Sequence, residues 1–155
     1  MKKLLLLPAI LASLIAAAIT QAPTAAMAGG IGNNYIAPAV GFGGGQTVFR
    51  VDSKLGIADY VSLRPFITFP SGGTEFGTSL TYDFDLRQAS IPITPFIGLG
   101  VGFQTGGSNS RTTGFAQVGA DLNVSESIAL LGSVSIPFDS NNRSTSVILG
   151  AGLRF

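Results

Sequence analysis

The sequence has 155 residues, of which 46% are hydrophobic and only 11% are charged, and it contains neither cysteine nor histidine. The lack of these two residue types excludes disulfide bonds, thiolate metal sites, histidine metal sites and histidine-based catalytic triads. Nine basic and eight acidic residues give a formal net charge of +1, so the chain has no basic field of the kind that attracts nucleic acid.

The start of the chain has the organisation of a secretory signal peptide. Two lysines precede an apolar stretch at Leu4–Ala18, and the residues Ala26–Ala28 form an A-x-A cleavage site. The apolar stretch is short for a membrane anchor. We therefore expect residues 1–28 to be removed near Ala28 and residues 29–155 to form the mature domain.

The mature chain is apolar and exported, yet it has no segment suited to a transmembrane helix. Removal of Lys2 and Lys3 leaves seven basic residues against eight acidic ones. No run of about 18 apolar residues follows Ala28. The other structure that spans a membrane is a closed β-barrel, because pairing between its strands satisfies every backbone polar group.

Turn residues divide the mature chain into eight short runs of nearly even length. Each run has about the 9–11 residues that a tilted transmembrane strand requires. No segment shows sustained helical periodicity, and no linker or second domain is indicated. The predicted strands are Tyr35–Gly43, Gln46–Ile57, Tyr60–Phe69, Glu75–Leu86, Thr94–Gln104, Thr113–Val124, Ile128–Phe138 and Thr145–Phe155.

Apolar and polar residues alternate along these strands, which gives each strand two different faces. In the second strand, for example, Phe49 and Val51 alternate with Arg50, Asp52 and Lys54. An eight-stranded barrel has an interior just large enough for side chains, and about five mostly bulky residues per strand on the apolar face are too many for it. The opposite face is rich in glycine. We therefore predict that the apolar face points outward.

Aromatic residues fall near the ends of the predicted strands, where a membrane barrel carries a girdle at each interface. With both termini in the periplasm, the hairpins at Thr105–Arg111 and Asp139–Ser144 face the outside. The outer girdle is predicted to contain Phe42, Phe49, Phe69, Phe76, Phe103 and Phe138, and the periplasmic girdle Tyr82, Phe84 and Phe155.

Over its whole mature length the chain resembles small eight-stranded bacterial outer-membrane barrels, the class of the OmpA transmembrane domain and OmpX. The predicted fold class is all-β, an eight-stranded antiparallel up-and-down transmembrane β-barrel. The resemblance implies a monomer in the outer membrane of a Gram-negative-type bacterium, in contact with outer-membrane lipid. It also implies that the last strand, with Val147, Leu149, Leu153 and Phe155, is similar to the signal read by the barrel-assembly machinery.

The predicted inward face carries equal numbers of acidic and basic side chains. Because buried charges need partners, we interpret them as a charge-balanced network that fills the lumen, although they also fit a narrow polar path or a small-ligand pocket. Asp83 and Asp85 lie two residues apart on this face and raise the idea of an acid/base pair, but the nearby cations favour a structural role. The network is Arg50, Asp52, Lys54, Arg64, Asp83, Asp85, Asp121 and Arg154.

The sequence therefore predicts an integral outer-membrane barrel with a structural or surface role, with no catalytic site, no cofactor, no metal and no nucleic-acid partner. Two alternatives stay open: a narrow channel for ions or small solutes, and a soluble exported barrel that holds a small apolar ligand. Pro38 and Pro65 fall within predicted strands, where each removes a ladder hydrogen bond, and we expect local bulges there.

Overall fold

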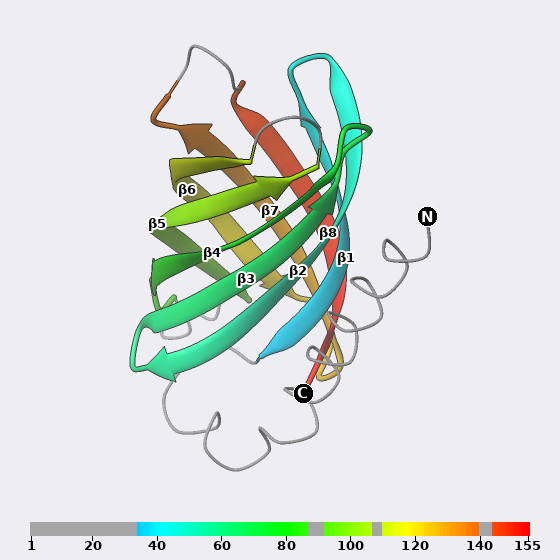
Figure 1. The fold of residues 1–155 in the computed structure, drawn as a ribbon. Helices are drawn as coiled ribbons and strands as arrows, with labels where there is room; N and C mark the ends of the chain where they lie inside the picture. The colour runs from blue at the N-terminus through cyan, green and yellow to red at the C-terminus, as the bar shows by residue number, and fades with distance from the viewer. Residues whose placement is uncertain (1–33, 87–91, 107–109, 140–143) are drawn as a thin grey trace.

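The computed structural model describes residues 34–86, 92–106, 110–139 and 144–155, so the predicted signal peptide lies outside the described residues. Each strand pairs antiparallel with the next, and β1 pairs with β8 to close a barrel (Figure 1). The strands are β1 (Tyr35–Gly43), β2 (Gln46–Ala58), β3 (Val61–Phe69), β4 (Thr74–Asp83), β5 (Ile93–Thr105), β6 (Arg111–Asn123), β7 (Ile128–Pro137) and β8 (Ser146–Arg154).

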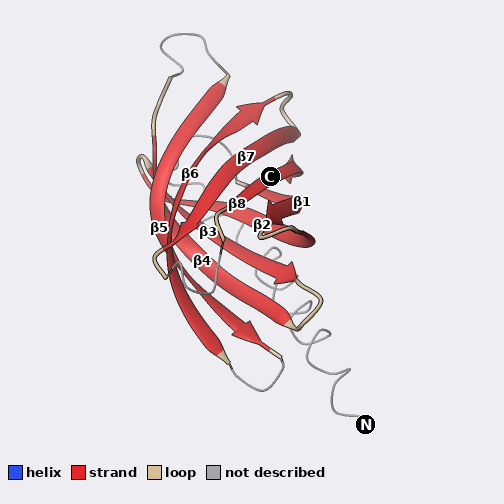
Figure 2. Ribbon diagram, turned by 90° about the horizontal axis from the view of Figure 1, so that it is seen from above, coloured by secondary structure: helices blue, strands red, loops and turns tan. Residues whose placement is uncertain are grey.

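All the regular elements of the described residues are strands, and they curve around one interior (Figure 2). Within these ranges there is no helix of the length and apolar character needed to cross a membrane. The predicted all-β, eight-stranded antiparallel barrel is confirmed.

The strand boundaries agree with the sequence to within a few residues, and the largest difference is at the end of β4. This strand ends at Asp83, whereas the alternation predicted Leu86. The Phe84 amide still donates to the Pro95 carbonyl at 2.8 Å. Because Pro95 has no backbone N–H, it cannot donate a hydrogen bond back to β4, and the regular pairing of β4 with β5 ends there.

Pro38 and Pro65 interrupt the sheet differently from expectation. Each proline stays in register with one neighbouring strand, Pro38 with β2 and Pro65 with β4, while the ladder on its other side omits the proline. The missing proline N–H removes bonds toward one neighbour only. The expectation of bulges at these prolines is wrong for the described ladders: the register shift lies between Gly56 and Ala58 in β2.

The sheet exposes its apolar face and buries its polar face, which is the reverse of a soluble barrel. Outward-pointing Leu80, Leu99 and Leu149 are 53%, 63% and 54% exposed, whereas inward-pointing Lys54 and Asp83 are 1% and 0% exposed. Apolar side chains left uncovered over the whole outer face mark a surface that meets an apolar environment. This arrangement opposes the soluble alternative.

The aromatic residues of both predicted girdles are exposed on the outer face. Phe49 stacks on Phe69 with ring centroids 6.1 Å apart, and Phe76 stacks on Phe103 at 5.8 Å. Both pairs are close neighbours across two strands, Phe49 on β2 with Phe69 on β3 and Phe76 on β4 with Phe103 on β5. Cross-strand aromatic pairs of this kind add stability to a sheet surface.

The outer face gives a direct test of its environment. Leu99 lies at the middle of β5, so Leu99→Arg should destabilise the barrel in phospholipid vesicles by about 2–4 kcal/mol. Val124, at the end of the barrel and equally outward, is the control, and Val124→Arg should cost about 0–1 kcal/mol. The measurement is equilibrium unfolding by denaturant in the same vesicles. Equal costs at the two positions would contradict a lipid-facing outer surface.

Candidate functional site

The lumen has two ends, which are named here by the chain. The terminal end holds the first residue of β1 and the last residue of β8, near the label C in Figure 1, and the distal end holds the last residues of β1, β3, β5 and β7. The inward side chains of β2 to β6 are mostly polar. Six inward residues of β1, β7 and β8 form an apolar cluster: Tyr35, Ala37, Ala39, Ala129, Leu131 and Ile148.

Four charged side chains form a buried cluster in the lumen, which we call the central cluster: Lys54, Arg64, Asp83 and Asp121. Lys54 Nζ lies 2.8 Å from Asp83 and 3.1 Å from Asp121. Arg64 Nη2 lies 3.2 Å from Asp83 and 2.8 Å from Asp121. Each cation therefore contacts both carboxylates, and each carboxylate contacts both cations, so the charges alternate around a closed cycle.

The backbone register explains why the two cations need this arrangement. The pairing of Leu55 with Leu63 brings Lys54 on β2 beside Arg64 on β3. Like charges opposite each other on one sheet face are destabilising. Asp83 from β4, the strand next to β3, and Asp121 from β6, across the lumen, each contact both positive charges.

Hydrogen bonds and an aromatic ring complete the shell of the central cluster. The Ser62 hydroxyl donates to Asp83 at 2.6 Å, and the Tyr35 hydroxyl donates to Asp121 at 2.9 Å. Arg64 Nε donates to the Thr81 hydroxyl at 3.0 Å, and its guanidinium carbon lies 3.5 Å from the centre of the Phe96 ring. These contacts offset the cost of removing four charges from water.

Arg50 and Asp52 form a second, separate pair nearer the distal end. Both belong to β2, and Arg50 donates from Nε and Nη2 to the two oxygens of Asp52 at 2.6 and 2.5 Å. The guanidinium also lies over the Phe66 ring, 4.3 Å from its centre. A bidentate contact of this kind fixes the orientation of the planar guanidinium.

Aromatic rings and a hydroxyl–amide chain fill the lumen between the charged groups. Phe66 and Phe115 meet edge to face with centroids 5.8 Å apart. The Phe115 ring occupies the place where a side chain on Gly100 would project, so only glycine fits at that position. Below this pair, the Ser79 hydroxyl donates to Gln117 at 2.7 Å, and Gln117 donates to Ser133 at 3.1 Å.

The predicted inward charges thus separate into the central cluster, the Arg50–Asp52 pair and two residues at the terminal end. Arg154 is half-buried and donates to the carbonyl of Ser125 in the β6–β7 turn. Asp85 is half-buried beyond the last residue of β4. Parity along the strand indicated an inward position for Asp85, but β4 ends before that residue.

Four aromatic residues of the lumen were missed by the sequence analysis, which assigned a face only to the nine girdle aromatics. The signal that identifies them is parity alone: Phe66 lies between inward Arg64 and Thr68, and Phe115 lies two residues before inward Gln117. The remaining two are Tyr35 and Phe96, both of which contact the central cluster.

The predicted terminal-strand residues lie on the outer face of β8 and at its end. Val147, Leu149, Leu153 and Phe155 are all exposed. The backbone N–H of Phe155 donates to the Asn34 carbonyl at 3.0 Å, which extends the β1–β8 seam to the terminal end.

Searches of protein-family models and of curated proteins find no match. Among solved structures, the chain is similar to the N-terminal β-barrel domain of Pseudomonas aeruginosa OprF, with a TM-score of 0.63 and 13% identity over 79% of this chain and 97% of that one. It is also similar to the de novo designed TMB2.3, with a TM-score of 0.61 and 16% identity over 81% of this chain and 96% of that one. A third similar structure is Yersinia pestis Ail in a phospholipid bilayer nanodisc, with a TM-score of 0.55 and 12% identity over 81% of this chain and 100% of that one.

The chain has the fold of an eight-stranded transmembrane β-barrel. In this transmembrane barrel the buried charges face the lumen and the exposed apolar residues face outward, as the sequence predicted. Those similarities show the fold, while the lumen contacts described above belong to this chain.

Removing Arg64 should destabilise the barrel strongly, because Asp83 and Asp121 would each lose one of two cationic partners. Breaking a buried pair costs about 3–5 kcal/mol, so we expect a loss of that order for Arg64→Ala. Arg111 is exposed at the distal end, and Arg111→Ala should stay within about 0.5 kcal/mol of the wild type. Denaturant unfolding in one lipid measures both. A wild-type stability for Arg64→Ala would contradict the role of the central cluster.

Proposed function

We propose that this protein is an integral outer-membrane barrel with a structural or surface role, without catalytic activity and with a lumen closed by its own side chains. The fold that it shares with the OprF barrel domain and with Ail supports the membrane location. The exposed apolar belt and its aromatic girdles support insertion into a bilayer.

The observation that carries the closed lumen is the stacking of side-chain layers along the barrel axis. The Phe66–Phe115 pair, the Gln117 chain and the central cluster follow one another from the distal toward the terminal end. Lys54 and Asp83 are inaccessible to solvent or nearly so. Ion-paired side chains packed across an eight-stranded interior, which is just wide enough for side chains to fill, support a closed lumen over the channel alternative.

A catalytic role for Asp83 is opposed by its contacts. One of its oxygens accepts from Lys54 and Ser62, and the other accepts from Arg64 and Thr81. A carboxylate offers about four acceptor positions, so Asp83 has none left for a substrate proton. Its contacts therefore support the non-catalytic, structural role.

Conductance measurements test the closed lumen. Purified wild-type protein in a planar lipid bilayer should give no steady conductance steps, because the layers of the lumen obstruct ion flow. Heat-modifiable gel mobility provides the control that the protein in the sample is folded. Large, steady channels from the folded protein would overturn the closed lumen and favour the transport alternative.

The proposed orientation puts the distal end outside the cell. The chain has no cysteine, so a single introduced cysteine is a unique probe. Ser110→Cys lies at the distal end and Ser125→Cys at the terminal end, and both positions are exposed. In intact cells, a membrane-impermeant maleimide should label the first variant and spare the second. Labelling of Ser125→Cys alone would reverse the proposed orientation.

We also propose that the outer face of β8 is the surface recognised by the barrel-assembly machinery. Its support is the row of exposed apolar side chains that ends at Phe155, beside the seam with β1. Phe155→Ala should slow the appearance of folded protein in the outer membrane after export. Phe138 is a matched exposed phenylalanine at the distal end, and Phe138→Ala should insert at the wild-type rate. Pulse-chase analysis by heat-modifiable mobility measures both, and equal rates would contradict a special role for β8.

A further inference from the structure

A small cavity opens into the lumen at the distal end, above the Phe66–Phe115 pair. Its volume is about 70 Å³. The rings of Phe66 and Phe115 lie on its inner side, away from the mouth. The remaining lining residues are Arg50, Glu75, Thr113, Ser135, Pro137, Ser144 and Ser146.

A row of polar side chains connects this cavity with the solvent. Successive cross-strand partners place Arg50 beside Thr68, Thr68 beside Glu75, Glu75 beside Gln104, and Gln104 beside Arg111. Arg50 and Thr68 are buried, Glu75 and Gln104 are half-buried, and Arg111 is exposed. Because strands in a barrel are tilted, the row climbs from the interior to the mouth.

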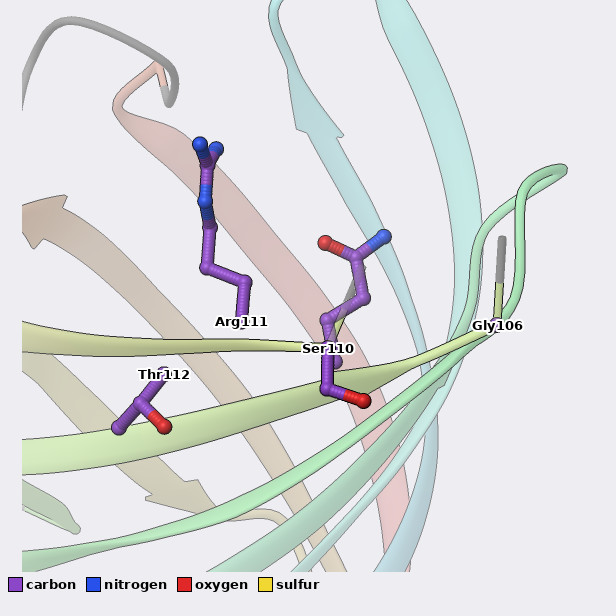
Figure 3. A pocket seen from close by; sticks show the side chains of 5 residues that line it. Gly106, Ser110, Arg111 and Thr112 are labelled. Carbon is purple, nitrogen blue, oxygen red and sulfur yellow. The ribbon is translucent and has the colours of Figure 1, made fainter. Parts of the chain in front are cut away.

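The upper end of this row borders a second, wider cavity. It has a volume of about 460 Å³ and is lined by Gln104, Gly106, Ser110, Arg111 and Thr112 (Figure 3). In Figure 3 the side chain of Arg111 projects to the opposite side of the β6 ribbon from that of Thr112, as alternation along a strand requires. Polar side chains therefore line the mouth from Arg111 at the rim down to Arg50 in the lower cavity.

The lining of the lower cavity combines several kinds of hydrogen-bonding group with an apolar floor. Four hydroxyls, from one threonine and three serines, both donate and accept. Glu75 adds a carboxylate, and the guanidinium of Arg50 is held in place by Asp52. The charges of Arg50 and Glu75, the two charged residues of this lining, sum to zero, so the lining gives no net attraction for an ion of either sign.

We propose that the distal cavity binds a neutral, polyhydroxylated solute, and that it takes two or three adjacent hydroxyl groups from one edge of a sugar ring. Adjacent hydroxyls match a wall of mixed donors and acceptors, and the C–H groups along that edge match the floor of Phe66 and Phe115. The enclosed space is too small for a whole ring, so the rest of the sugar lies toward the mouth. This binding goes beyond the proposed function and does not depend on the membrane in which the barrel resides.

Titration with D-glucose tests the proposal on the whole barrel in phospholipid nanodiscs. A small site of this kind should bind glucose with a dissociation constant of about 1 mM. Saturable chemical-shift changes are expected at the backbone amides of Thr113, Ser135 and Ser146, measured by nuclear magnetic resonance. Amides of the β6–β7 turn at the terminal end should not shift.

Two variants alter the site in different ways. Glu75→Gln removes the charged acceptor and should weaken glucose binding about tenfold. Gly102→Ala would put a Cβ atom 2.5 Å from Glu75 Oε1; since that oxygen is at the tip of a flexible side chain, the barrel should fold while the carboxylate moves into the cavity, and binding should weaken similarly. Glu126→Gln, the same chemical change in the exposed β6–β7 turn, is the control and should bind as the wild type does.

Several outcomes overturn the proposal. One is the absence of saturable shifts in the folded wild type at about 10 mM glucose, tenfold above the expected constant. Another is equal binding by Glu75→Gln, Gly102→Ala and Glu126→Gln. Tighter binding of glycine or of inorganic phosphate than of glucose would assign the cavity to zwitterions or to anions instead. These results are separate from the conductance measurement, because a closed barrel and a sugar-binding mouth succeed or fail independently.

Discussion

The structure depends on the need to neutralise charge inside a closed sheet. Lys54 and Arg64 are neighbours on adjacent strands, and their mutual repulsion is balanced by Asp83 from the next strand, β4, and by Asp121 from the far side of the lumen. The four side chains hold four strands at fixed distances from one another. Since an uncompensated charge in this position costs several kcal/mol, the cluster selects one register of the barrel over its alternatives.

The outside of the barrel is apolar and the inside is mostly polar, because each face meets a different environment. The backbone of every strand is satisfied by its two neighbours, which leaves the outer face free to consist of exposed leucine, isoleucine and phenylalanine. The polar side chains gather inside, where aromatic rings such as Phe96 and Phe115 fill the space above glycines. The lumen is therefore filled with side chains as a protein core is, although most of these side chains are polar or charged.

The strands and the two faces could be predicted from the sequence because period-two alternation and turn residues are local signals. The partners inside the lumen could not, because they depend on the stagger between strands. Asp52 binds Arg50 on its own strand, whereas Asp121 binds Lys54 from the far side of the barrel, and nothing in the order of residues separates these cases. Asp85 had the right parity but lies beyond the end of β4. The lumen phenylalanines received no assignment, although parity with inward neighbours such as Arg64 and Gln117 places them inward.

The distribution of charge around the barrel also bears on the order in which the molecule can be assembled. The ion-paired residues come from β2, β3, β4 and β6, whereas the inner faces of the closing strands β1 and β8 contribute mostly apolar residues, the hydroxyls of Tyr35 and Ser146, and Arg154 at the terminal end. Joining β1 to β8 therefore brings together mainly alanine, glycine and isoleucine surfaces, and Arg154 at the terminal end is the one charge on the inner faces of these two strands. The ion pairs of the lumen involve neither closing strand, so the β1–β8 seam adds backbone pairing along a mostly apolar inner surface.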